Sequence, residues 1–143
     1  MDALSGILRH PTTLRLARFA LGVVLLAAAL AKIGDPAALA LQVHNYRLAP
    51  VWSEHLVAIV LPWVELTTGL ALVVGVRARA GAVVGLALMA FFTVAVGSAW
   101  ARGLDFECGC FGKASASRIG AVKFVENVGL TALALIASLR RRD

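Results

Sequence analysis

The chain contains two cysteines, Cys108 and Cys110, separated only by Gly109. Two sulfurs this close in sequence can bond to each other only if the backbone turns tightly between them, and glycine permits such a turn. A disulfide across so short a loop should be strained, and strained disulfides are reduced more easily than relaxed ones. It would also stabilise the fold little, because a structural disulfide gains most from closing a long loop. The spacing therefore favours a reversible dithiol–disulfide pair over a structural bridge.

Three other interpretations of the cysteines stay open at this point. They can be small buried hydrophobic residues, although the flanking residues are polar and typical of a loop. Thiolates also bind copper, but neither Met1 nor Met89 is close enough in sequence to complete such a site. Zinc would need two more ligands, which His44 or His55 could supply from another connection. Redox exchange explains the spacing better than any of the three.

Three ionisable residues inside apolar stretches are candidates for supporting the cysteines. Glu65 falls near the middle of such a stretch, where a charged group by default faces a partner or a cavity. Lys123 and Glu126 are three residues apart, so we expect them to pair along one helix rather than to form a proton relay. Lys32, at the end of the first stretch, is expected to extend its amine to the membrane interface. No phosphate-binding glycine loop, nucleophile elbow or dinucleotide motif occurs, so the enzyme interpretation depends on the cysteines alone.

The composition indicates a membrane protein. The chain has 143 residues, of which 60% are hydrophobic and 15% charged, whereas soluble domains are about 25% charged. A bilayer is crossed by about 20 helical residues, and four stretches reach that length. The alternating pattern of a β-barrel is absent, and the basic residues lack the clustering that nucleic-acid binding needs. We therefore predict an all-α integral membrane protein, a four-transmembrane-helix bundle in one domain over 1–143, with spans at about 14–33, 56–76, 80–100 and 118–139.

A short amphipathic helix is predicted on the outer side, between the first two spans. Asp35 and Pro36 together are typical of a helix start, with Asp as the cap and Pro at the first helical position. Apolar residues then recur at helical spacing as far as Tyr46, and Pro50 ends the run. The first apolar stretch has an alternative interpretation as a cleaved signal peptide, which would leave three spans. We favour a span, because the apolar run continues into further spans.

The charges predict the orientation in the membrane. Eight basic and two acidic residues flank the spans on one side, whereas six of each lie on the other, so the formal net charge of +6 falls on one side. Basic residues near spans favour the cytoplasmic side. We therefore expect a multi-pass protein of the bacterial inner (cell) membrane, with both termini cytoplasmic and the Cys-Gly-Cys loop outside. An oxidising compartment outside the membrane agrees with a redox role.

Several motifs resemble those of known membrane proteins. Residues 32–36 (Lys-Ile-Gly-Asp-Pro), 45–50 (Asn-Tyr-Arg-Leu-Ala-Pro) and 62–65 (Pro-Trp-Val-Glu) resemble the DoxX-like membrane proteins. Arg102 and Gly103, followed by the Cys-Gly-Cys-Phe-Gly run at 108–112, narrow the resemblance to the MauE, or methylamine-utilisation, branch. The resemblance covers nearly the whole chain, from about residue 14 to residue 139.

The resemblance implies a four-helix membrane bundle that works with a thioredoxin-like partner on the periplasmic face. In methylamine utilisation, such a protein is required to mature a dehydrogenase subunit rich in disulfides. The fold is also similar in outline to vitamin K epoxide reductase and the DsbB-type oxidases. Those proteins carry further cysteines and a quinone site, whereas this chain has one cysteine pair.

The leading hypothesis is a membrane thiol–disulfide redox protein that acts through Cys108 and Cys110. Both cysteines lie outside, and disulfide exchange alone cannot reach cytoplasmic thiols across about 30 Å of hydrocarbon. The redox partner is then a periplasmic thioredoxin-like protein, which we favour, or a quinone held near Trp63, Trp100 and Lys123. The alternative hypothesis is a non-enzymatic scaffold or assembly factor, or a copper-binding or permeation bundle.

The surroundings of the two cysteines differ in the predicted loop. We expect Cys108 to lie nearer the bundle and Cys110 to be more exposed. Asp105, like the glutamate that precedes Cys108, should raise the pKa of a neighbouring thiol. A cation such as Lys113 or Arg102 would be needed to offset that effect.

Overall fold

The computed structural model describes residues 1–108 and 118–139, so Cys110 and Lys113 lie outside the described residues. The helices are α1 (Asp2–Leu8), α2 (Pro11–Ile33), α3 (Pro36–Tyr46), α4 (Val51–Val74), α5 (Ala78–Ala101) and α6 (Ala121–Ser138). In this part of the chain, four helices, α2, α4, α5 and α6, are long and apolar enough to cross a membrane. The prediction of an all-α, four-span membrane protein is confirmed.

Proline and glycine set the bounds of the first two membrane-spanning helices. Pro11 occupies the first position of α2, and the preceding His10 side chain accepts a hydrogen bond from the Thr12 N–H, so the helix begins earlier than the predicted span. α4 also begins early, directly after Pro50. It ends at Gly75, whose φ of 85° lies in the left-handed region that favours glycine. The short α1 was not predicted.

α3 is the predicted helix between the first two spans. Its start is as expected, because the Asp35 carboxylate accepts a hydrogen bond from the Ala38 N–H at 3.0 Å. Its end comes before Pro50, at Arg47, which adopts a left-handed conformation with φ of 51°. The buried side chains of α3 pack against Ala58 of α4. The contact with α4 fixes α3 across one end of the bundle.

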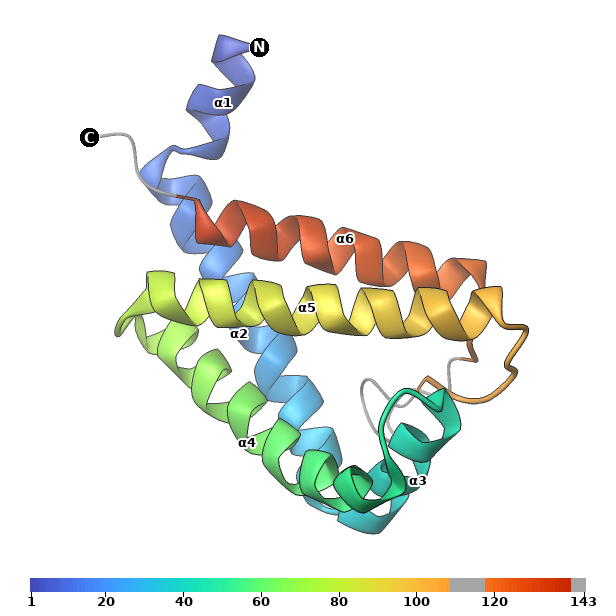
Figure 1. The fold of residues 1–143 in the computed structure, drawn as a ribbon. Coiled ribbons are helices and arrows are strands. Elements are labelled where there is room, and N and C mark those ends of the chain that lie inside the picture. Colours follow the sequence, from blue (N-terminus) through green and yellow to red (C-terminus); the bar gives the residue numbers. More distant parts are fainter. Residues whose placement is uncertain (109–117, 140–143) are drawn as a thin grey trace.

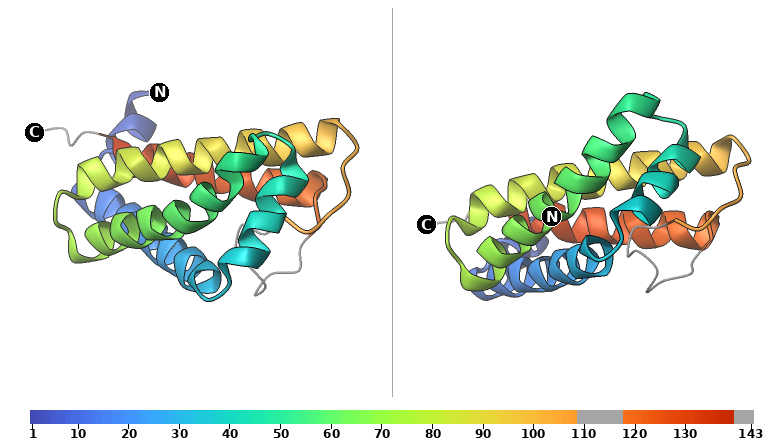
Figure 2. Two further views of the ribbon diagram at one scale, coloured as in Figure 1. Left: turned by 60° about the horizontal axis from the view of Figure 1, so that its bottom comes forward. Right: turned by 90° about the horizontal axis from the view of Figure 1, so that it is seen from below.

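The four long helices form a bundle (Figures 1 and 2). α5 and α6 run antiparallel and side by side, α2 packs along α4, and α4 diverges from α5 after the tight turn that joins them. The start of α2, this turn and the end of α6 lie together at what we call the terminal end. α3 and the chain that follows α5 lie at the opposite end, which we call the Cys108 end. The space between α4 and α5 therefore widens toward the Cys108 end.

α2 and α4 approach each other most closely at a pair of glycines. A Cβ atom on Gly22 would lie 2.9 Å from the Gly69 carbonyl oxygen, and a Cβ on Gly69 would lie 2.9 Å from the Gly22 carbonyl oxygen. Real Cβ atoms do not come this close to a backbone oxygen, so the crossing requires glycine at both positions. The backbones of α2 and α4 are therefore in direct contact at this crossing.

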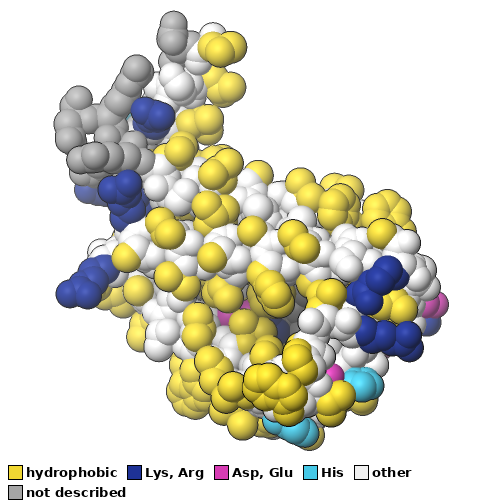
Figure 3. Space-filling view, in the orientation of Figure 1, with side chains coloured by type: hydrophobic (Ala, Val, Ile, Leu, Met, Phe, Trp, Pro, Cys, Tyr) yellow, Lys and Arg dark blue, Asp and Glu magenta, His cyan; other side chains and the backbone are white. Residues whose placement is uncertain are grey.

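Large apolar side chains cover much of the outside of the helices (Figure 3). Leu70 is 53% exposed, Val83 52% and Val94 69%. Apolar surface of this extent is unfavourable in water, and lipid is its natural solvent. Lys and Arg side chains instead gather toward the terminal end and the Cys108 end in Figure 3. The surface therefore indicates a bundle embedded in a lipid bilayer.

Candidate functional site

A backbone bridge closes the connection between α5 and α6. Glu107 and Arg118 form an antiparallel bridge, and beside it the Ile119 N–H donates to the Phe106 carbonyl oxygen at 2.9 Å. These contacts bring the two stems of the connection together, which is why α6 begins later than the predicted span. Cys108 directly follows the bridge and is held at the end of the bundle.

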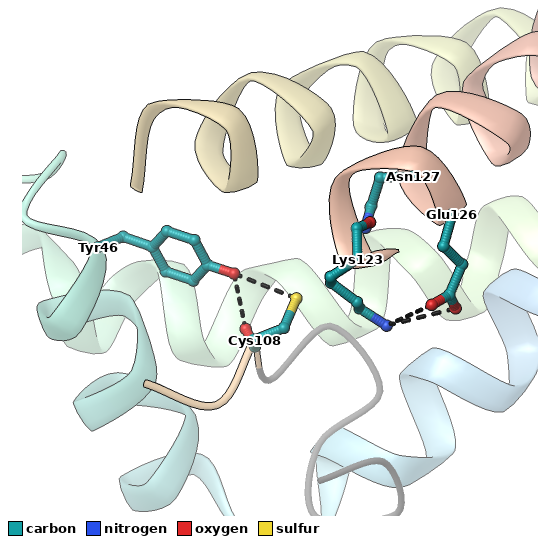
Figure 4. A network of polar contacts seen from close by, with 5 residues as sticks. All are labelled: Tyr46, Cys108, Lys123, Glu126 and Asn127. Atoms are coloured by element: carbon teal, nitrogen blue, oxygen red, sulfur yellow. Dashed lines mark hydrogen bonds and ion pairs between the residues drawn. The ribbon is translucent and has the colours of Figure 1, made fainter. Parts of the chain in front are cut away.

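Cys108 is buried against α3 (Figure 4). Its side chain is 3% exposed, as expected for the cysteine nearer the bundle. The Tyr46 hydroxyl donates to the Cys108 carbonyl oxygen at 2.8 Å and lies within hydrogen-bond distance of its Sγ, at 3.2 Å. The Tyr46 ring also meets the Phe106 ring edge-on, with 4.8 Å between centroids. Cys108 is not a free thiol in the structure, and the expectation for Cys110 falls outside the described residues.

Tyr46 is the residue that positions Cys108, and the sequence indicated it only as part of a helical pattern. Burial raises the pKa of the Tyr46 phenol above its ordinary value, because the phenolate loses hydration. The hydroxyl therefore stays protonated, and able to donate, through the neutral and moderately alkaline range. The Arg102 guanidinium donates to the Tyr46 carbonyl oxygen, which ties the end of α5 to the end of α3.

The charged residues near Cys108 have partners of their own. Asp105 pairs with Arg118 at 2.9 Å, and both side chains are more than half exposed. Arg102 donates to the Tyr46 carbonyl oxygen. Arg118 is the cation that pairs with Asp105, and this pair was not evident from the sequence because the backbone bridge brings the two residues together. Lys113, the other expected cation, lies outside the described residues.

A buried ion pair joins α2 to α4. The Lys32 Nζ lies 2.8 and 3.0 Å from the two carboxylate oxygens of Glu65, and the residues are 2% and 0% exposed. The amine also lies 5.0 Å from the centroid of the Phe92 ring. The expectation that Lys32 extends to the interface is wrong, because Glu65 offers a charged partner within its reach inside the bundle. Glu65 faces a buried charged partner, Lys32, as expected for an ionisable residue near the middle of a span.

Lys123 and Glu126 form the predicted pair within α6. Their closest atoms, Nζ and Oε2, are 3.2 Å apart; the Lys123 side chain is 3% exposed and that of Glu126 47%. The Asn127 amide donates to the Lys123 carbonyl oxygen at 2.9 Å and is also buried. Figure 4 shows these residues at the start of α6, in the same part of the molecule as Cys108. A polar group of this kind stabilises the first turns of α6.

Two of the three histidines, His10 and His44, have separate hydrogen-bond partners. His44 Nδ1 lies 2.9 Å from the Glu54 carboxylate, and His10 caps α2. Within residues 1–108 and 118–139, no three His, Cys, Asp or Glu side chains gather as a metal site would require.

Comparison with known proteins gives one consistent family. The family model described as "Methylamine utilisation protein MauE" matches residues 10–140. Three relatives carry the name "Methylamine utilization protein MauE". The protein of Paracoccus denitrificans is 33% identical over 92% of this chain and 72% of its own length. Those of Methylorubrum extorquens and Methylophilus methylotrophus are each 31% identical, over 87% and 92% of this chain and 68% and 70% of their own lengths. No solved structure matches the chain.

Proposed function

The chain belongs to the MauE family, and from that premise we propose that it is a membrane thiol–disulfide redox protein. Its reactive group is the pair Cys108 and Cys110, which exchanges a disulfide with a periplasmic thioredoxin-like protein. The wider DoxX-like resemblance stays a prediction.

The placement of Cys108 is the observation that carries the proposal. The sulfur lies at one end of the bundle, beside a backbone bridge and against the Tyr46 hydroxyl. A cysteine that only filled lipid-facing space would need neither contact. Disulfide exchange, in contrast, benefits from a sulfur held in a fixed position, because an ordered nucleophile or leaving group lowers the entropic cost of reaction. Glu65, Lys123 and Glu126 support the site by holding α4 and the start of α6 in place.

The exchange proceeds through a mixed disulfide. A thiolate of the partner attacks one sulfur of the Cys108–Cys110 disulfide; a new S–S bond forms, and the other cysteine leaves as a thiolate. The second thiol of the partner, as a thiolate, then attacks the mixed disulfide and releases the remaining cysteine. Two electrons pass from the partner to this protein, and the partner leaves with a disulfide. Because Cys108 is buried, we expect Cys110 to bond to the partner and Cys108 to be the leaving sulfur.

The names of the relatives suggest the pathway. All three are methylamine utilization proteins. We place this chain in the same pathway, where it would support disulfide formation or maturation of an exported protein. Cys108 and Cys110 would carry out the disulfide exchange that this maturation requires.

Trapping experiments test the redox function. In cells carrying Cys108→Ser, the Cys110 thiolate is expected to attack the disulfide of the oxidised thioredoxin-like protein and to accumulate as a mixed disulfide, because one of the two thiols that can resolve that bond, Cys108, is gone and only the second thiol of the partner remains. Cys110→Ser should trap much less, since Cys108 is buried. The double variant controls for non-specific bonding, and mass spectrometry identifies the attached protein. Absence of any mixed disulfide from both single variants would favour a scaffold, copper-binding or permeation role instead.

The proposed orientation places the Cys108 end outside the inner membrane and both termini in the cytoplasm. The start of α2 carries Arg15 and Arg18, the α4–α5 turn carries Arg77 and the first turn of α5 carries Arg79, so the terminal end is basic. Basic residues next to spans are retained on the cytoplasmic side. These residues support the proposed orientation independently of the cysteines.

We predict that a membrane-impermeant thiol reagent labels the reduced protein from outside the cytoplasmic membrane in spheroplasts. The reason is that both cysteines would lie on the periplasmic face. A variant with Cys108→Ser and Cys110→Ser, and with a cysteine in place of Ala78 at the start of α5, provides the control and should label only after permeabilisation. The reverse pattern would invert the topology and remove the periplasmic partner.

A further inference from the structure

An apolar cavity of about 330 Å³ lies between α3, α4 and α5, with Cys108 in its wall. Leu39 and Val43 line it from α3, Leu61 from α4 and Phe92 from α5. Cavities of this size and apolar character are typical small-molecule sites when a few polar groups converge on them. The described residues that line this cavity do not include Trp63, Trp100 or Lys123, near which the sequence places the less favoured redox partner, a quinone. The space was not evident from the sequence, because its walls come from four helices, the connection between α3 and α4, and the segment after α5.

The cavity is reached from the lipid-facing side of the bundle. Phe91 and Leu48 line it and are 56% and 48% exposed. Figure 3 shows the molecule hollowed on this face, between α4 and α5, with hydrophobic side chains around the hollow. In a bilayer, large apolar side chains at an opening are compatible with lipid. A ligand that enters here is therefore soluble in the membrane.

Two polar groups in the cavity wall can bind the oxygen atoms of a ligand. The Gln42 Oε1 is buried and has no hydrogen-bond partner among the residues that the structure describes, which is costly unless a ligand donates to it. Lys32 also lines the cavity. An ammonium has three N–H donors, and Lys32 directs two hydrogen bonds to Glu65, so one N–H is available for a ligand. The cavity thus offers an acceptor and a donor inside apolar walls.

We propose that this cavity binds a membrane quinone, which reoxidises the cysteine pair. The inference rests on the proposed function, because it names the electron acceptor of the same site. A quinone is membrane-soluble, has a flat ring suited to the aromatic wall at Phe91 and Phe92, and has carbonyl oxygens that accept from Lys32. Its reduced form has hydroxyls that donate to Gln42. An acyl chain would fill the apolar space but would leave the Gln42 oxygen unpaired.

The reaction balances without any further reactant. The S–H bonds of Cys108 and Cys110 break and one S–S bond forms. Two electrons and two protons pass to the quinone, whose two carbonyls become hydroxyls. Exchange with the partner then reduces the pair again, so that the net reaction converts the partner's dithiol and a quinone into a disulfide and a quinol. The position of Cys108 in the cavity wall brings the reacting sulfur next to the acceptor.

Two adjacent positions on α5 provide a matched test of the cavity. Ala95 lines the cavity and is 5% exposed, whereas Val94 does not line it and is 69% exposed. In lipid nanodiscs, reduced wild-type protein should convert one short-chain ubiquinone or menaquinone per chain to quinol, followed by its ultraviolet absorbance and by loss of free thiols. Ala95→Trp fills the cavity and should slow this reaction at least about tenfold. Val94→Trp should react at the wild-type rate.

A second variant and a binding measurement keep the test independent of folding defects. Gln42→Leu removes the unpaired acceptor with little change in size, and should weaken binding of the quinol by roughly three- to tenfold, the value of one hydrogen bond. A photoactivatable azido-quinone should label α3 and α5 of the oxidised wild-type protein, which cannot react further. Each variant must also give a single elution peak and react with dithiothreitol at the wild-type rate.

The possible failures are distinguishable. No quinone reduction, with mixed disulfides still trapped on the thioredoxin-like protein, would overturn the quinone site and leave the proposed function intact. Equal quinone rates in Ala95→Trp, Gln42→Leu and wild type, or labelling outside the cavity, would also overturn it. Loss of the mixed disulfides with quinone reduction retained would instead overturn the thioredoxin-like partner.

Discussion

Replacing Glu65 with glutamine is expected to lower the free energy of unfolding by about 3–5 kcal/mol, the usual cost of removing one partner from a buried ion pair. Lys32 would keep a buried amine without its carboxylate, since its two hydrogen bonds to side-chain oxygens both go to Glu65. The sequence alone predicts that the protein tolerates Glu65→Gln, because a glutamate at this depth can be neutral through protonation. The ion pair with Lys32 changes that expectation, because the substitution leaves the buried amine without a carboxylate. Titration of the purified protein with a denaturing detergent measures the effect.

Two further variants separate the ion pair from a general effect of the substitution. Lys32→Met combined with Glu65→Gln removes both charges and should recover most of the lost stability. Glu126→Gln removes a carboxylate that is 47% exposed, and should change the stability by less than about 1 kcal/mol. Wild-type stability of Glu65→Gln would contradict the buried pair. Loss of redox exchange at unchanged stability would give Glu65 a direct role in the chemistry.

The four spans and α3 were predictable from the sequence because each depends on a local property, whereas α1 was not predicted. Long apolar runs predict the spans, and Asp35 with Pro36 predicts the start of α3, which the structure has. The bounds were less accurate where a tertiary contact or a cap decides them. α6 begins only after the backbone bridge at Arg118, which is later than predicted. α3 ends at Arg47, which has a left-handed conformation, and not at Pro50.

The contacts between helices were not predictable, because they join residues far apart in the chain. Lys32 and Glu65 are 33 positions apart, and Tyr46 and Cys108 are 62 apart. Periodicity within one helix does not say which face meets which neighbour. It did identify Lys123 and Glu126, which lie one turn apart on α6 and do pair. The two cysteines could therefore be named as candidate site residues from the sequence. Tyr46, which contacts Cys108, and the adjoining cavity could be identified only from the structure.

Gly22→Ala is expected to lower the free energy of unfolding by about 1–3 kcal/mol, the usual cost of inserting a methyl group where packing is complete. The new Cβ would meet the Gly69 carbonyl oxygen at 2.9 Å, and neither backbone can move away without separating α2 from α4. That separation would also weaken the Lys32–Glu65 pair, which joins the same two helices.

Gly129→Ala is the matched control, since it makes the same substitution in α6 where, beyond the adjoining backbone of the helix itself, no atom of the described residues lies within 4 Å of the new Cβ. It should leave the stability unchanged or raise it by up to about 1 kcal/mol through helix propensity. Gly97→Ala should fall between the two, because its Cβ meets the far edge of the Phe124 ring, at 2.8 Å, and a side chain can shift where a backbone cannot. If all three variants unfold at the same detergent concentration, α2 and α4 do not cross as closely as the structure has them, and the position of Lys32 beside the cavity loses its support.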